Sequence, residues 1–362
     1  MKKISSLTGM RFVMTLVIIL SHMEFLSETS LAEPYSYLHN ALPAVDFFFM
    51  LSGFGLMYSR RAKPGLALHP VRDAVRRIRK LYPLYLLTMA VSIPYSIYTY
   101  WLSGENARQI IQAVVRRVVL CVPLLQSCTG IQSYTNAFNG VCWFLSCLFI
   151  LYIAFPFLAR LADFLCRNTA STVMCLAGTW VLFLACADGM LWMQERYRFD
   201  NLIYGAPYGR VFYFFTGMVC WHLWDRLRQR PRCTPARATG AEIAVSAAVF
   251  LWFVGRPHLS LPWFAAYLLD LGLAAGLLVI LALEQGALSA ALSGPRMQRL
   301  GNAAMYMYLL HYPLRLYSDL LVHTLLPRPG TAVLVLECAA LFAVSIGAGL
   351  VLYDRALKKK AA

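Results

Sequence analysis

The chain has 362 residues, of which 59% are hydrophobic and only 14% are charged. Soluble domains carry roughly a quarter charged residues, so this composition excludes a water-soluble globular protein. The net charge of +16 does not indicate a nucleic-acid binder, because basic loops in a membrane chain report orientation and contact with anionic headgroups. We therefore expect membrane lipids as partners and no nucleic acid.

Long apolar runs recur along the whole chain. Each holds about 18 to 23 residues, enough to cross a hydrocarbon core of about 30 Å as a helix. Barrel strands need only about 9 to 11 residues, so the runs predict an all-α, polytopic transmembrane bundle. In chain order, the ten predicted spans are 7–26, 44–60, 78–101, 141–161, 169–187, 204–224, 240–255, 263–283, 302–324 and 330–352.

Lysine and arginine fall mostly in the loops that this scheme places on one side of the membrane. Segments 60–80 and 226–237 and the C-terminal end are rich in them, whereas the external loop 27–43 has none. By the positive-inside rule, both termini are predicted to lie in the cytoplasm. No shift in composition divides the chain, so we expect residues 1–362 to form a single membrane domain.

One apolar segment, 110–126, does not fit a spanning helix. Arg116 and Arg117 lie at its centre, and counting it as a span would place the later arginine clusters outside. We predict instead a re-entrant or interfacial helix on the outer face. The ten cysteines show no paired metal-ligand spacing, so no metal site is expected.

Arg11 and His22 are ionisable residues within the first predicted span. At about 100° and 1.5 Å per residue they share one face of a helix, about 16 Å apart along its axis. Charged groups at membrane depth are costly and mark functional candidates, although an interhelical ion pair is the structural alternative. Because an imidazole titrates near neutral pH, His22 is the best candidate for a general base.

Three further ionisable residues are predicted at a depth similar to that of His22. Asp46, Arg210 and Arg315 come from three other helices and lie about 3 to 10 Å below the external boundary at the helical rise. We expect a polar cavity that opens outward, in which Asp46 orients the His22 ring. Arg210 or Arg315 would then stabilise an oxyanion.

A second basic group precedes the third predicted span on the cytoplasmic side. Arg76 and Arg79 are spaced i, i+3, so on a helix they point the same way and form a fork suited to phosphate. Positive-inside topology alone is the alternative explanation for basic residues at this place.

Six sequence motifs are spread along the chain from its beginning to its end. They are LTGMRFVMTLVIILSH (7–22), AVDFFFMLSGF (44–54), RRIRKLYPLYL (76–86), WFLSCLFILYIAFP (143–156), GRVFYFFTGM (209–218) and LGNAAMYMYLLHYPL (300–314). Together, and in this order from end to end, they resemble the acyltransferase 3 family of integral membrane acyltransferases.

The resemblance implies an O-acyltransferase, commonly an acetyltransferase. It would move an acyl group from cytoplasmic acyl-CoA, with acetyl-CoA as the donor, to a hydroxyl of an extracytoplasmic or lipid-linked glycan. Such acceptors include exopolysaccharide and other cell-envelope polysaccharides, and the implied location is the bacterial plasma membrane. A transporter or flippase built on a related bundle is the alternative.

The resemblance also implies roles for particular residues. The family's Arg-to-His pair falls on Arg11 and His22, with His22 implied as catalytic and Arg11 expected along the path of the donor. Its R-x-x-R motif falls on Arg76 and Arg79, implied in coenzyme A binding.

Further matches bear on the expected cavity. Ser52 matches the SGF element, Trp143 matches the WFLS element, and His311 is the second candidate for a base. The chain departs from many members at Leu148, where they carry glutamate, and at Ala304, where they carry serine. Both departures leave His22 as the strongest base candidate.

Overall fold

The computed structural model describes residues 4–62 and 69–361, and every regular element in these ranges is a helix. In chain order the elements are α1 (Ser5–Ser21), η1 (Glu24–Glu28), α2 (Ala32–Ser36), α3 (Leu42–Arg61), α4 (Pro70–Ile78), α5 (Tyr82–Leu102), α6 (Ala107–Cys121), η2 (Gln126–Thr129), α7 (Gln132–Thr135), α8 (Trp143–Leu165), α9 (Thr169–Arg196), α10 (Pro207–Leu227), α11 (Pro235–Gly255), η3 (Arg256–His258), α12 (Trp263–Ala282), α13 (Ala287–Leu292), α14 (Pro295–Leu325) and α15 (Thr331–Ala361).

Six segments of the described chain are long and apolar enough to cross a membrane. They are α3, α8, α9, α12, most of α15, and the segment Pro235–His258 that holds α11 and η3, while α1 is apolar but shorter. Helices α5, α10 and α14 coincide with other predicted spans but contain more tyrosine and polar side chains. The predicted all-α transmembrane bundle is confirmed, whereas the number of ten spans and the cytoplasmic termini stay predictions.

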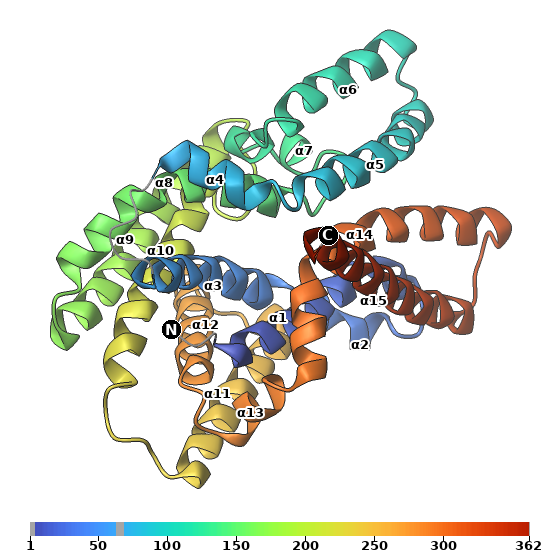
Figure 1. Ribbon diagram of the computed structural model, residues 1–362. Coiled ribbons are helices and arrows are strands. Elements are labelled where there is room, and N and C mark those ends of the chain that lie inside the picture. Colours follow the sequence, from blue (N-terminus) through green and yellow to red (C-terminus); the bar gives the residue numbers. More distant parts are fainter. Residues whose placement is uncertain (1–3, 63–68, 362) are drawn as a thin grey trace.

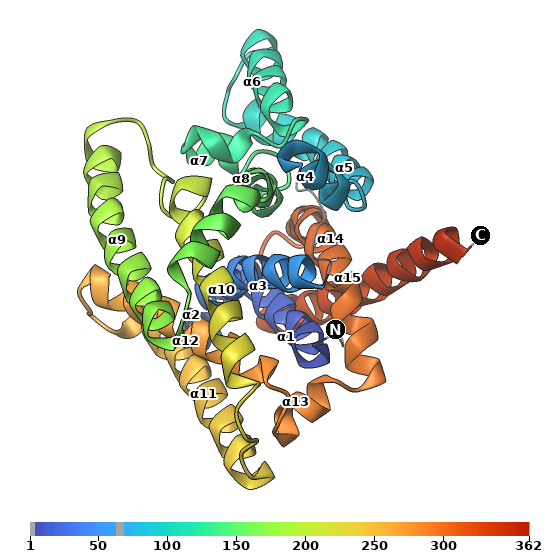
Figure 2. The same ribbon diagram turned by 60° about the vertical axis from the view of Figure 1, so that its left-hand side comes forward.

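Helices α1, α3 and α14 lie together at the centre of the molecule (Figure 1, Figure 2). Helices α10 and α12 pack against α3, α9 packs against α10, and α15 packs along α14. The hairpin of α5 and α6 projects from one end of the bundle (Figure 1). The central helices carry most of the residues singled out by the sequence, so their crossings position the site.

Glycine lets these central helices approach each other at backbone distance. A Cβ atom on Gly53 would lie 2.0 Å from the carbonyl oxygen of Phe214, and one on Gly217 would lie 1.9 Å from that of Met50. Helices α3 and α10 therefore cross in backbone contact. Gly301 serves the same purpose on α14, where a Cβ would meet a backbone oxygen of α1 at 1.8 Å.

Polar contacts place the start of α1 and the end of α15 on the same side of the bundle. The backbone N–H groups of Ser5 and Ser6 donate to Glu284, between α12 and α13, and the Ser5 carbonyl oxygen accepts from Gln298 near the start of α14. Arg299, near the start of α14, pairs with Asp354, near the end of α15. A shared side is what an even number of spans requires, and which side faces the cytoplasm stays a prediction.

Helix α6 covers most of the segment 110–126 and ends at Cys121. It folds back along α5, and the guanidinium of Arg117 lies over the rings of Tyr100 and Tyr134. Helix α6 is not among the helices apolar enough to span a membrane. Its re-entrant or interfacial position stays a prediction.

Helix α14 bends near its middle (Figure 1). Pro313 lies inside the helix, where proline removes a backbone hydrogen bond and kinks the chain. The second arm is tied to α5 by the Tyr317 hydroxyl, which donates to the Val91 carbonyl oxygen at 2.6 Å. His311 and Arg315 flank the proline, so the candidate site lies at the bend.

Candidate active site

His22 stands at the exit of α1, which ends at Ser21. Its ring centroid lies 5.4 Å from that of His311 and 5.4 Å from that of Tyr312, both on α14. The His22 side chain is 28% exposed, whereas His311 is fully buried. The close crossing of α1 and α14 thus brings together two imidazoles that the sequence had predicted only separately.

The carboxylate beside His22 is Glu24. Glu24 Oε1 lies 3.8 Å from His22 Nδ1, and Glu24 Oε2 lies 2.8 Å from Arg315 Nη2. The contact with His22 and the charge of Arg315 both stabilise the ionised form of the Glu24 carboxylate. Sequence reasoning missed Glu24, although its position two residues after His22, at the end of an apolar run, could have revealed it.

The predicted contact between Asp46 and His22 is not made. Asp46 is fully buried, and its Oδ1 accepts a hydrogen bond from Arg210 Nη1 at 2.5 Å. The reason lies in the helix crossing: Asp46 and Arg210 each stand seven residues before the glycine of their own helix, Gly53 and Gly217. Seven residues are about two turns, so both side chains lie on the faces where α3 and α10 meet.

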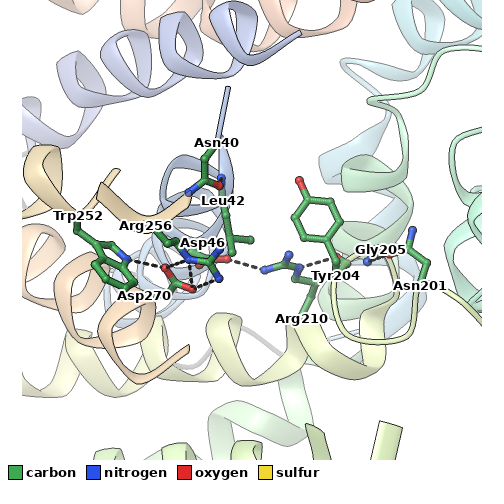
Figure 3. A network of polar contacts seen from close by, with 10 residues as sticks. All are labelled: Asn40, Leu42, Asp46, Asn201, Tyr204, Gly205, Arg210, Trp252, Arg256 and Asp270. Atoms are coloured by element: carbon green, nitrogen blue, oxygen red, sulfur yellow. Dashed lines mark hydrogen bonds and ion pairs between the residues drawn. The ribbon is translucent and has the colours of Figure 1, made fainter. Parts of the chain in front are cut away.

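Aromatic rings enclose the guanidinium of Arg210. Its central carbon lies 4.6 to 5.7 Å from the ring centroids of Phe49, Trp143, Tyr204 and Tyr213. Its Nε donates to the Tyr204 carbonyl oxygen, and Figure 3 shows the guanidinium between Asp46 and Tyr204. Arg210 is therefore not placed to meet a substrate oxyanion, and Trp143 belongs to its cage.

A second ion pair, in which the carboxylate is buried and the guanidinium is partly exposed, lies beside the first (Figure 3). Asp270 on α12 is bonded to Arg256 at 3.0 Å and accepts a hydrogen bond from Trp252 Nε1 at 2.8 Å. The cluster balances two guanidinium groups with two carboxylates inside the bundle. Because every charge has a bonded partner, we interpret it as structural.

A cavity of about 230 Å³ lies between α1, α3, α8 and α14. Arg11, Thr15 and Ser52 line it, so two of the predicted binding residues meet there. In the described part of the chain, no hydrogen bond or ion pair engages the Arg11 guanidinium, and Thr15 Oγ1 is buried without a partner. Unpartnered polar groups on a cavity wall indicate a place for a polar ligand.

The two departures from the family pattern line this same cavity. Leu148 on α8 and Ala304 on α14 both contribute to its wall. Where many members carry polar side chains, this wall is therefore apolar.

Arg76 and Arg79 do not reach the cavity. With Arg72, Val75 and Lys80 they line a separate surface hollow of about 470 Å³ on α4 and the turn after it. The two arginines therefore share a face, as their spacing predicted.

The basic residue of α4 that approaches the cavity is Arg77. Its guanidinium carbon lies 5.9 Å from the ring centroid of Tyr152, and Tyr152 lines the cavity. Sequence reasoning passed over Arg77 because the i, i+3 spacing drew attention to its neighbours.

The fold and the site define a polytopic helical membrane protein whose histidine pair stands beyond an arginine-lined cavity. A family model for acyltransferase 3, described as an acyltransferase domain, matches residues 4–354. The chain therefore belongs to the acyltransferase 3 family of membrane acyltransferases, as the resemblance predicted.

Among curated proteins, the chain is similar to the protein named acyltransferase MdmB of Streptomyces mycarofaciens, with 30% identity over 165 residues. The match covers 44% of this chain and 40% of that relative. The chain thus spans less than half the length of the relative, so the similarity supports an acyltransferase and no particular substrate. No solved structure matches the chain.

Proposed function

We propose that this protein transfers an acyl group, in the first instance acetyl, from cytoplasmic acyl-CoA to a hydroxyl of an extracytoplasmic or lipid-linked glycan in the bacterial plasma membrane. Family membership supports the acyl transfer. One observation supports the route: the basic hollow, the cavity with Arg11, and the pair of His22 and His311 follow one another along the bundle.

The hollow and the cavity adjoin at the turn after α4. Lys80 lines the hollow, and the next residue, Leu81, lines the cavity. Arg76 and Arg79 would bind the coenzyme phosphates in the hollow, because guanidinium groups suit phosphate oxygens. Arg11 would meet the pantetheine arm inside the cavity.

Beyond Arg11 the cavity leads toward the two histidines. Its lining includes Ile18 and Tyr308, which stand about one helical turn before His22 and His311. At the helical rise, Arg11 and His22 are about 16 Å apart, which is of the order of the length of a pantetheine arm. A thioester held by this arm would reach the histidine pair.

His22 would act as the general base. As the acceptor hydroxyl oxygen attacks the thioester carbonyl carbon, the hydroxyl proton passes to the imidazole and the carbonyl electron pair moves onto oxygen. Collapse of this intermediate breaks the C–S bond, and the imidazolium returns the proton to the departing thiolate. The products are an acylated glycan and free coenzyme A, and Glu24 would stabilise the imidazolium in between.

The test is His22→Ala, assayed in inverted membrane vesicles with radiolabelled acetyl-CoA. Label that mild alkali releases from the cell-envelope glycan fraction reports O-acetylation. We expect the rate to fall at least about 100-fold in a variant that is inserted and as stable as the wild type. The matched control is His222→Ala, because His222 pairs with Asp163 near the C-terminal ends of α10 and α8.

Two results would contradict the proposal. Wild-type labelling by the His22→Ala variant would refute the role of His22. Absence of label with the wild-type protein would refute the function.

Thermal stability with coenzyme A separates this function from a transporter or flippase. Coenzyme A should raise the melting temperature of the purified protein, because a ligand that binds only the folded state stabilises it. Arg76→Ala/Arg79→Ala should abolish the shift, whereas the control Arg230→Ala/Arg232→Ala should keep it. Indifference of the wild-type protein to coenzyme A would favour a solute carrier.

A further inference from the structure

Both arginines that were predicted from the sequence as oxyanion donors already have partners in the structure. Arg210 and Arg315 are each bonded to a carboxylate, although Arg315 keeps one buried Nε without a partner. His311 lies closer to the expected reaction, because its ring centroid is 5.4 Å from that of His22. The surroundings of His311 therefore decide whether it can serve in their place.

His311 is a buried imidazole without a hydrogen-bond partner. It is 0% exposed, and neither ring nitrogen forms a hydrogen bond of acceptable geometry. The carbonyl groups of Met307 and Tyr308 lie near the ring, in the preceding turn, but outside that geometry. Since buried polar groups are almost always hydrogen-bonded, an orphaned ring about one helical turn beyond Tyr308, which lines the cavity, points to a ligand.

We propose that His311 is a second catalytic residue, which donates a hydrogen bond to the oxyanion formed when the acceptor hydroxyl attacks the acyl carbonyl. This inference rests on the proposed acyl transfer. During attack the carbonyl π electrons move onto oxygen, and the His311 N–H stabilises that charge without giving up its proton. When the oxyanion collapses, the electrons re-form the carbonyl, the C–S bond breaks, and the proton held by His22 leaves with the thiolate.

The two imidazoles have different neighbours, which assigns them different roles. Glu24 faces His22 and can stabilise the positive charge that this ring acquires with the proton. The rings around His311 are those of His22, Tyr308 and Tyr312, and no carboxylate of the described chain contacts it. A positive charge on His311 would be buried without a counter-ion, which is unfavourable. His22 is therefore the better proton acceptor and His311 the better neutral donor.

The distance between the rings of His22 and His311 suits one proton acceptor and one hydrogen-bond donor acting on the same substrate. A base and an oxyanion donor must reach different oxygens of one tetrahedral centre, each over about 2.7 to 3.1 Å. The two centroids are 5.4 Å apart, and the ring planes are inclined by 34°, so each ring can bond a different oxygen. The donor role requires the His311 proton on the ring nitrogen that faces the substrate, and a neutral imidazole can carry its proton on either nitrogen.

The experiment compares His311→Ala with His311→Gln in the vesicle assay, with initial rates measured against acetyl-CoA concentration and pH. The alanine variant loses the donor and should lower kcat about 100- to 1000-fold, while KM for acetyl-CoA stays within about threefold of the wild type. The glutamine variant keeps a neutral N–H donor and should recover at least about tenfold of that loss. Its pH–rate profile should keep the wild-type shape, because the base is unchanged.

Three outcomes would overturn the proposal. They are wild-type kcat in His311→Ala, a glutamine variant no better than alanine, and loss of the acid limb of the pH–rate profile in the glutamine variant. A loss of this size in Arg315→Gln, with His311→Ala unaffected, would assign the oxyanion to Arg315 instead.

If the alanine variant does not fold, His311→Phe fills the space without an N–H group and replaces it in the comparison. An unlabelled glycan with the wild-type protein would refute the proposed function itself, before any variant is compared.

Discussion

Asp46→Asn removes the negative partner of Arg210 with little change in shape. Both side chains are at most 2% exposed, so the variant leaves a guanidinium charge inside the bundle with no carboxylate bonded to it. Removing one partner of a buried ion pair costs about 3 to 5 kcal/mol. The surrounding aromatic rings attract the guanidinium in both proteins, so they do not offset the loss. We therefore expect the free energy of unfolding to fall by about 3 to 5 kcal/mol.

The assay is reversible unfolding of the purified protein in mixed micelles, with the free energy of unfolding compared between variants. The matched variant Asp46→Leu/Arg210→Met removes both charges at once and replaces them with apolar side chains of similar size. Such replacements are often neutral or stabilising, so the double variant should be more stable than Asp46→Asn. A loss below about 1 kcal/mol in Asp46→Asn, or a double variant less stable than the single one, would refute the reasoning.

This measurement also bears on how activity data for Asp46 should be interpreted. Asp46 contacts Arg210 and not His22, so we expect its variants to lose activity through loss of the fold. A catalytic role for Asp46 would require a variant that is fully stable and yet inactive.

Three substitutions test the helix crossing, the cavity and the carboxylate beside His22. Gly53→Ala should lower the free energy of unfolding by about 1 to 3 kcal/mol or more, because the added Cβ meets a backbone oxygen at 2.0 Å. The control Gly55→Ala places its Cβ in open space and should be neutral or stabilising. Equal stability of the two variants in the micelle assay would contradict the helix crossing. Ala304→Leu fills part of the cavity and should slow acetyl transfer about tenfold or more, with transfer from butyryl-CoA slowed further. Rates equal to those of the control Ala339→Leu, which changes an exposed alanine of α15, would show that the donor does not use the cavity. Glu24→Gln should lower the transfer rate by no more than about fivefold, because this carboxylate is 54% exposed and solvent screens its charge. A loss of about 100-fold in the vesicle assay would mean that Glu24 does more than stabilise the charge on His22.

The relations within single helices could be predicted from the sequence. Arg11 lines a cavity whose wall includes Ile18, about one turn before His22, while the shared helix face of Arg11 and His22 stays a prediction. Arg76 and Arg79 line one hollow, as their spacing predicted. Such relations can be predicted because 3.6 residues per turn fix the direction of each side chain once the helix is known.

The predicted contact between Asp46 and His22 rested only on their similar depth below the outer membrane boundary, and it was wrong. Asp46 was matched with His22 because both lie near the outer boundary, but rotation about the helix axis points Asp46 at Arg210. Depth says nothing about this rotation. The repeated interval of seven residues before Gly53 and Gly217 was the sequence signal that could have revealed the pair.

The sequence by itself determined that this chain is a helical membrane protein of the acyltransferase 3 family, because apolar run length and the ordered motifs are local properties. Only the tertiary structure decided which polar groups become partners: Glu24 with Arg315, and His22 beside His311. These choices depend on where helices cross and where α14 bends, and they are set by the close fit of glycines and the proline kink across segments far apart in the chain.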